Sequence, residues 1–231
     1  MVESKIIIPL DGMTQSEALL MAEQLSGAVW GFKVNDLLLA CGVSIIEKLK
    51  RYGRVFADAK LHDIPNTVGN SIRQLEDGGA DIITVHASGG IEMLRKAAAE
   101  AKRASVIAVT VLTSLTPSDT QEIFVRTPGQ AVLDLARLVR RAGLGGIVCS
   151  PAELDLLAAD AELKQLIKVT PGVRPMWYQK GDDQRRTKTP REALDAGATY
   201  LVIGRPITGH DDPRQAVGLV DAELAPSPRS L

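Results

Sequence analysis

The stretch VFADAKLHDIPNT (residues 55–67) begins as an apolar run and ends among charged side chains. Its first residues are typical of a buried β-strand, and Asp58, Lys60 and Asp63 follow them. On a regular strand, the side chains of Asp58 and Lys60 leave the same face, whereas Ala59 between them points the other way. The stretch therefore predicts a buried strand that presents a carboxylate and an ammonium group side by side.

Short runs rich in β-branched residues recur along the whole chain. The full set is KIIIPLD (5–11), AVWGFKV (28–34), VFADAK (55–60), DIITVHA (81–87), SVIAVTVL (105–112), GIVCS (146–150), IKVTPGV (167–173) and YLVIGRPI (200–207). Stretches with apolar residues at i, i+3 and i+4 lie between them, over 16–25, 45–52, 91–103 and 131–143. This alternation predicts a parallel sheet covered by helices, closed into a (β/α)8 TIM barrel; an open doubly wound sheet is the alternative.

The length and composition of the chain favour one domain that acts on a small molecule. The 231 residues are 45% hydrophobic, enough for one sizeable core, so we expect a single barrel domain over residues 1–231. Lys plus Arg total 27 against 28 Asp plus Glu, which gives no broad electrostatic reason to bind nucleic acid or a membrane. The expected partner is therefore a small-molecule substrate.

The cysteines and the N-terminal segment indicate a cytoplasmic protein. Cys41 and Cys149 lie far apart in apolar surroundings, so both are expected to be core thiols in a reduced compartment. The segment MVESKIIIPLDGMT contains a short apolar run that Pro9 and Asp11 interrupt, too short for a signal sequence or a membrane span.

Polar residues close most of the predicted strands. They are Asp11, Lys33, Asp58 with Lys60, His86, Thr113, and Gly204 with Arg205. In a (β/α)8 barrel the chemistry takes place at the carboxyl ends of the strands, where these residues meet. Each has a structural alternative when taken singly, because an Asp after a strand often caps a helix and a terminal Lys often extends to the surface. Charged residues on three successive strands favour a functional site.

A charged array is expected around the strand at 55–60. Lys33 from the neighbouring strand and Asp63 from the following loop are expected to join Asp58 and Lys60 in an alternating Lys-Asp-Lys-Asp arrangement, which makes partly buried charges tolerable. Negative neighbours favour the ammonium form of a lysine, so Lys60 is expected to act as an acid. Such an array is suited to stabilising a carbanion and then protonating it.

A second group of residues, late in the chain, indicates phosphate binding. The segments VTPGVRP (169–175) and LVIGRPITGH (201–210) end the last two predicted strands, whose loops often bind phosphate in this fold. Gly204 permits close backbone approach, and Arg205 is suited to a paired contact with phosphate oxygens. The polar segment QKGDDQRRTKTP (179–190) is expected to be a loop that closes over a ligand, with a solvated linker as the alternative.

Four motifs, DAKLHDIPNT, TPGVR, DQRR and IGRPI, together resemble the orotidine 5'-phosphate decarboxylase family in its bacterial type. The resemblance runs from PLD near the N-terminus to GRPIT, essentially the whole chain. It implies loss of CO2 from orotidine 5'-monophosphate to give uridine 5'-monophosphate, a step of de novo pyrimidine nucleotide biosynthesis. It also implies that no cofactor takes part, whether metal, flavin or pyridoxal.

The resemblance assigns the charged residues a direct part in the reaction. Asp11 and Lys33 would hold the ribose hydroxyls, with Lys33 also part of the array. Asp58 would face the substrate carboxylate, and Lys60 would protonate the product carbanion. Asp63 would complete the catalytic set from the partner subunit of a homodimer.

The remaining implied site residues bind substrate. Ile64 and Thr67, like Asp63, would reach across the dimer interface, and Thr113 would lie near the pyrimidine. The phosphate and its closing loop would be held by Arg174, Gln184, Gly204 and Arg205.

The histidines do not suggest a metal centre. His62, His86 and His210 lack HxH or HExxH spacing. His86 either lines the pocket or is a hydrogen-bonded structural residue, and the resemblance gives His62 no chemical role.

Two other functions are compatible with the same residues. The first is a related barrel that decarboxylates or isomerises a sugar phosphate with Mg²⁺ bound at the array. The second is a non-catalytic phosphate-ligand-binding barrel, which would keep its affinity after Lys60→Ala.

Overall fold

Eight parallel strands close into a barrel in the computed structural model, which describes residues 4–178 and 188–225. The strands are β1 (Ile6–Pro9), β2 (Gly31–Val34), β3 (Arg54–Leu61), β4 (Ile82–His86), β5 (Ser105–Val109), β6 (Gly146–Val148), β7 (Ile167–Pro171) and β8 (Tyr200–Val202). Each strand pairs with the next, and β8 returns to β1, with Leu201 opposite Ile6. The predicted (β/α)8 fold is confirmed, and the open sheet is excluded.

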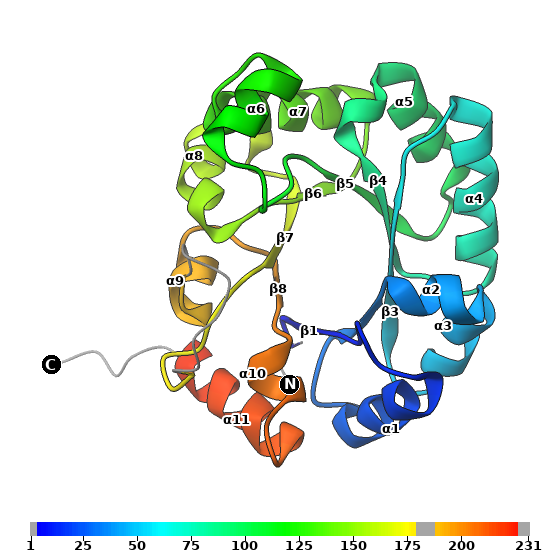
Figure 1. The fold of residues 1–231 in the computed structure, drawn as a ribbon, viewed down its shortest axis with the longest axis vertical. Helices are drawn as coiled ribbons and strands as arrows, with labels where there is room; N and C mark the ends of the chain where they lie inside the picture. The colour runs from blue at the N-terminus through cyan, green and yellow to red at the C-terminus, as the bar shows by residue number, and fades with distance from the viewer. Residues whose placement is uncertain (1–3, 179–187, 226–231) are drawn as a thin grey trace, which may run out of the picture.

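The helices form a ring outside the strands (Figure 1). They are α1 (Gln15–Leu25), α2 (Asp36–Cys41), α3 (Ser44–Leu49), α4 (Pro65–Asp77), α5 (Ile91–Glu100), α6 (Pro117–Phe124), α7 (Pro128–Ala142), α8 (Leu154–Ala159), α9 (Pro190–Asp195), α10 (Arg205–Thr208) and α11 (Pro213–Leu224), with short 3-10 turns at Ala87–Gly89, Pro151–Glu153 and Ala161–Leu163. The four helices expected from periodicity correspond to α1, α3, α5 and α7, although α3 and α5 end three residues earlier than expected.

Threonine caps fix where several helices begin. Thr14, Thr116, Thr127 and Thr189 each accept a hydrogen bond from the backbone three residues on, and the side chain at that position bonds back to the cap. In the last three cases proline fills the first helical position, where its missing N–H costs nothing.

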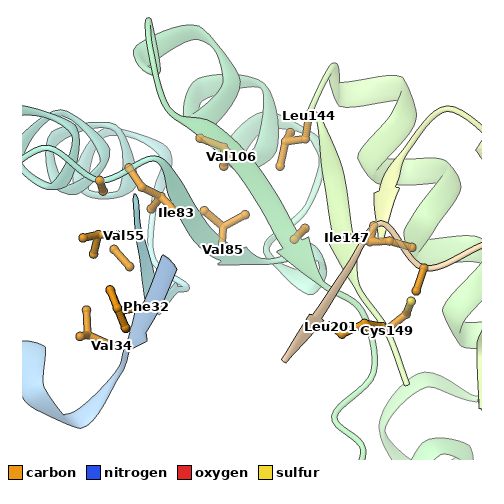
Figure 2. Close-up of a cluster of buried hydrophobic side chains, with 14 of the residues drawn as sticks. Phe32, Val34, Val55, Ile83, Val85, Val106, Leu144, Ile147, Cys149 and Leu201 are labelled. Carbon is orange, nitrogen blue, oxygen red and sulfur yellow. The ribbon is translucent and has the colours of Figure 1, made fainter. Parts of the chain in front are cut away.

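Apolar side chains cover both faces of the barrel wall. An inner cluster fills the barrel and consists of Ile7, Trp30, Phe56, Ile82, Ile107, Val169 and Val202. A larger cluster lies between strands and helices, and Figure 2 shows part of it, including Phe32 of β2, Val55 of β3 and Val106 of β5. Since successive strand residues face opposite sides, burial of both faces explains the nearly continuous apolar runs in the sequence.

The end of β3 departs from regular strand geometry. The strand pairs regularly with β4 as far as Ala57, and pairing resumes at Leu61, so residues 58–60 face one β4 residue, Thr84. This is an expanded β-bulge. Lys60 has a φ of +48°, in the left-handed region that residues other than glycine rarely adopt. The backbone pairing is irregular here, yet Asp58 and Lys60 line the same cavity while Ala59 packs against the outer apolar cluster, as expected.

Candidate active site

A cavity of about 440 Å³ opens at the carboxyl ends of the strands. This volume is in the range of small-molecule sites. The sequence-predicted residues on its wall are Asp11, Lys33, Asp58, Lys60, Thr113, Arg174, Gly204 and Arg205. The fold therefore brings together residues that are spread over nearly 200 positions of the chain, as is usual for the loops at this end of a (β/α)8 barrel.

Four charged side chains alternate in sign along one wall of the cavity. Lys33 Nζ donates to both carboxylate oxygens of Asp11, at 2.9 and 2.8 Å, and lies 3.3 Å from Asp58 Oδ2. Lys60 Nζ lies 2.5 Å from the same Asp58 oxygen. The order within the chain is thus Asp11–Lys33–Asp58–Lys60, which we call the charge array, and its formal charge is zero.

Asp63 does not join the charge array of its own chain. Asp11 pairs with Lys33 there, and Asp63, which is expected to reach the array of a partner subunit, is exposed beyond the end of β3. The physical reason is that the chain turns outward after the bulge, and the Asp63 carboxylate accepts a hydrogen bond at 2.6 Å from the N–H of Ile64.

The members of the array differ in their contact with solvent. The side chains of Lys33 and Asp58 each keep only 9% of their surface exposed, whereas Lys60 keeps 34% and Asp11 keeps 48%. The two inner charges are therefore tolerable only because each has an oppositely charged neighbour.

The Asp58 carboxylate is stabilised in its ionised form. Burial raises the pKa of Asp58, but the ammonium groups of Lys33 and Lys60, together with hydrogen bonds from Lys60 and Thr84, outweigh burial and hold the pKa below its ordinary value. Asp58 is therefore charged at neutral pH and keeps both lysines in place.

The opposite wall of the cavity is apolar. It is formed by residues at the ends of β5 to β8: Val109, Val111, Val148, Pro171 and Val202. Cys149 also lines it, and burial raises the pKa of its thiol to about 12, so this thiol stays protonated. The cavity therefore has one charged side and one apolar side.

Glycine and arginine occupy the cavity edge after β7 and β8. Gly172 has a φ of +82°, and a Cβ on Gly204 would lie 3.0 Å from Pro9 Cγ, so both positions favour glycine. Arg174 and Arg205 line the cavity beside them. Two guanidinium groups at one end of a cavity are typical of a phosphate site.

Three predicted site residues do not line the cavity of their own chain. Asp63, Ile64 and Thr67 are all exposed between β3 and the first turn of α4, and Ile64 keeps 67% of its surface exposed. A fourth, Gln184, lies outside the described residues, as does most of the loop at 179–190.

The two histidines nearest the site lie side by side and off the cavity wall. The rings of His62 and His86 are 5.5 Å apart, and neither residue lines the cavity. Burial lowers the pKa of half-buried His86, and His62 and Lys60 add to this effect. Of the two places expected for His86, the one on the wall of this cavity is not seen.

Sequence reasoning missed the apolar half of the cavity and one polar contact. The missed wall residues include Pro9, Leu112, Thr208 and the valines at the ends of β5, β6 and β8. These valines stand in continuous apolar runs. The sequence does not show which of them point into the cavity and which pack in the core, because that depends on how the barrel closes. Thr84, which bonds to Asp58, was missed for the same reason.

The described residues, 4–178 and 188–225, contain neither a metal-binding cluster nor a membrane-spanning helix. Within these ranges no three His, Cys, Asp or Glu residues gather closely enough to hold a metal ion. No helix in the same ranges is both long and apolar enough to cross a bilayer.

The barrel and the residues at its mouth define a (β/α)8-barrel enzyme. Residues 4–219 match the model of the orotidine 5'-phosphate decarboxylase / HUMPS family, and the chain belongs to this family. It is 40% identical to the orotidine 5'-phosphate decarboxylase of Actinobacillus succinogenes, over 96% of this chain and 99% of that protein. It is 42% identical to the enzyme of the same name from Pseudomonas aeruginosa, over 96% and 98%.

Solved structures agree with this assignment. The orotidine 5'-phosphate decarboxylase of Lactobacillus acidophilus superposes with a TM-score of 0.82 at 30% identity, covering 96% of this chain and 99% of that one. An uncharacterized conserved protein from Geobacillus kaustophilus gives the same TM-score at 31% identity, over 95% and 100%. The relatives therefore match in length and fold as well as in sequence.

Proposed function

We propose that this chain decarboxylates orotidine 5'-phosphate to uridine 5'-phosphate and CO2, as a step of pyrimidine nucleotide biosynthesis. Membership of the family and the names of relatives about 40% identical over nearly the full chain support this activity. The single observation that carries the proposal is the charge array, which places a partly exposed ammonium group of Lys60 at the cavity, 2.5 Å from Asp58.

The reaction breaks the bond between the pyrimidine ring and its carboxylate. The electron pair of that bond stays on the ring carbon, CO2 leaves, and Lys60 gives its proton to the carbon. The barrier is the developing negative charge, and an ammonium group held nearby lowers it without reorganisation of solvent. Lys60 is therefore both the stabilising charge and the acid.

The other members of the array keep Lys60 in position and bind the sugar. Asp58 fixes Lys60 and Lys33 through one oxygen, at 2.5 and 3.3 Å. Asp11 and Lys33 hold the ribose hydroxyls, because both stand at the cavity with donor and acceptor atoms. Thr113 and the apolar wall receive the pyrimidine ring.

The phosphate group binds at the opposite edge from the reacting carbon. Arg174, Gly204 and Arg205 are the residues assigned to it, with Gln184 of the adjoining loop, which lies outside the described residues. Contacts remote from the reacting bond contribute to catalysis when they are strengthened in the transition state. Phosphate binding is thus expected to affect turnover as well as affinity.

The proposed form of the enzyme is a homodimer in the cytoplasm. The exposed position of Asp63, Ile64 and Thr67 leaves them accessible to a second copy, which would receive Asp63 in its own array. An exposed Ile64 side chain beside a charged residue suits burial at a two-fold interface. Both cysteines are free thiols, as expected in a reduced compartment.

The test is the ultraviolet absorbance of the orotate ring. Protein treated with chelator and then given orotidine 5'-phosphate should remove this absorbance. It should also release one CO2 for each orotate ring consumed. Loss of activity in chelator, restored by Mg²⁺, would instead support a metal-dependent sugar-phosphate barrel. Tight binding of the nucleotide without any turnover would support a binding protein.

A further inference from the structure

Thr84 is a buried polar residue in the middle of β4, in the otherwise apolar run IITVH. Its exposed fraction is 0%, and it stands on the strand next to β3 without lining the cavity. A buried hydroxyl is costly unless its hydrogen bonds are made. Its partners therefore indicate what it does.

The Thr84 hydroxyl bonds to two parts of the segment that carries Lys60. Its Oγ1 accepts a hydrogen bond from the backbone N–H of Lys60 at 2.9 Å. The same hydroxyl donates to Asp58 Oδ1, also at 2.9 Å. One hydroxyl has both capacities, so both bonds coexist.

These two bonds lie at the point where the barrel wall is irregular. Residues 58–60 of β3 all face Thr84, so the backbone of Lys60 is out of register with β4. The hydroxyl replaces the missing backbone partner at the residue whose φ is +48°. Asn35 braces the bulge from the other side, because its Nδ2 donates to the Asp58 carbonyl at 2.7 Å.

Thr84 also determines which oxygen of the Asp58 carboxylate is left for the lysines. Oδ1 is occupied by the Thr84 hydroxyl, which leaves Oδ2 for the two lysines, at 2.5 Å for Lys60 and 3.3 Å for Lys33. A rotation of the carboxylate would exchange these oxygens, and the bond from Thr84 opposes it. The direction of the Lys60 ammonium therefore depends on a residue that does not touch the cavity.

We propose that Thr84 is a positioning residue, whose hydroxyl holds the β3 bulge and the Asp58 carboxylate in the geometry that aims Lys60 at the reacting carbon. This inference rests on the proposed decarboxylation. Because Thr84 acts through Asp58 and Lys60, it controls the chemical step rather than the binding of the nucleotide. Displacement of a catalytic group by about 1 Å can cost about 100-fold in rate.

The central experiment compares Thr84→Val with Thr84→Ser. Thr84→Val keeps the shape of the side chain and removes both hydrogen bonds, so kcat is expected to fall by about 10- to 100-fold while KM stays within about threefold. Thr84→Ser keeps the hydroxyl and is expected to recover most of the lost kcat. A fall in kcat that Ser does not rescue would overturn the proposal.

A double variant tests whether Thr84 acts through Lys60. On a Lys60→Ala background the residual rate is expected to change less than about threefold when Thr84→Val is added, because the group being positioned is already absent. A full additional loss on that background would show that Thr84 acts elsewhere, and the proposal would fall.

A matched control separates positioning from stability. Thr110 is also buried, just beyond β5, and its hydroxyl donates to a single backbone carbonyl, that of Val148, at 3.1 Å. Thr110→Val is expected to lower the melting temperature but to leave kcat within about twofold of wild type. An equal loss of kcat in both valine variants would overturn the proposal.

Two provisions keep the outcome clear. If Thr84→Val does not fold by circular dichroism, Thr84→Ala replaces it, since that variant also lacks the hydroxyl and relieves crowding. Wild type is assayed in the same series, and an inactive wild type would refute the proposed decarboxylation itself. If wild type is active and the valine or alanine variant is equally active, the positioning role of Thr84 is refuted while the proposed decarboxylation stands.

Discussion

Lys60 Nζ lies 2.5 Å from Oδ2 of Asp58, the same oxygen that receives Lys33 from the other side. Removal of Lys60 therefore leaves Asp58 paired with Lys33, and no buried charge is left alone. Lys60→Ala is expected to fold normally. Its turnover is expected to fall by more than the ~10²–10⁴ usual for proton transfer alone, because the electrostatic stabilisation is lost as well. Absorbance kinetics measure this loss.

A surface lysine provides the control for this substitution. Lys50 Nζ lies 2.7 Å from Asp81, an ion pair of similar length that does not line the cavity. Lys50→Ala is expected to keep wild-type turnover. Near-normal activity of Lys60→Ala would contradict its assignment as the proton donor.

Arg205 gives a prediction about the phosphate end. If Arg205 binds the phosphate, Arg205→Ala should reduce kcat/KM strongly for the phosphorylated substrate and barely alter the slow reaction of the nucleoside without phosphate. Arg191, which pairs with Asp195 on the surface at 3.0 Å, is the control. Equal losses on both substrates would place the function of Arg205 elsewhere.

Glu76 gives a prediction about stability and pH. Burial raises the pKa of this carboxyl, but hydrogen bonds from the backbone N–H groups of Ala104, Arg103 and Lys102 outweigh it and lower the pKa. A lowered folded-state pKa stabilises the protein above the ordinary pKa of Glu, and this stabilisation is lost as pH falls through the folded-state value. Glu76→Gln should therefore lower the free energy of unfolding by about 2 kcal/mol at pH 7.

The difference between Glu76→Gln and wild type should shrink in acid. Urea denaturation at pH 7, 5 and 3.5 measures it, and the deficit is expected to shrink once the pH falls below the ordinary pKa of Glu, because the unfolded chain then takes up the proton. Turnover should be unaffected, because Glu76 lies away from the cavity. A deficit that stays constant with pH would assign the loss to packing.

The sharing of Asp63 between subunits predicts complementation. Lys60→Ala and Asp63→Asn subunits, unfolded and reassembled together, would form heterodimers with one site that lacks both groups and one that is intact. Random pairing makes about half the dimers mixed, so activity should recover to roughly a quarter of wild type. Mass spectrometry confirms the exchange of subunits. Activity equal to the average of the two parents would exclude a shared Asp63.

The fold was predictable because each strand is buried on both faces. This burial requires the nearly continuous apolar runs that mark all eight strands, and the glycines and threonine caps lie between them. The short helices α6 and α9 were not predicted from periodicity, because they contain too few turns. The cap signals TPSD (116–119) and TPRE (189–192) were present in the sequence and locate both.

The site was predictable where charge marks it. Asp58 and Lys60 stand out at the end of an apolar run, and the structure places both at the cavity. The β3 bulge was not predictable, since local sequence does not determine how many residues face one partner on the next strand. For this reason Thr84 passed as an ordinary strand residue.

The unequal exposure of the two lysines has a consequence for successive turnovers. A lysine that gives away its proton must be recharged from water before the next cycle, whereas a lysine that serves only as a fixed charge need not meet solvent at all. Lys60 keeps 34% of its side chain exposed, and Lys33 keeps 9%. In the proposed cycle, the spent amine of Lys60 meets water at the open mouth of the cavity once the product leaves, whereas Lys33 keeps its proton throughout.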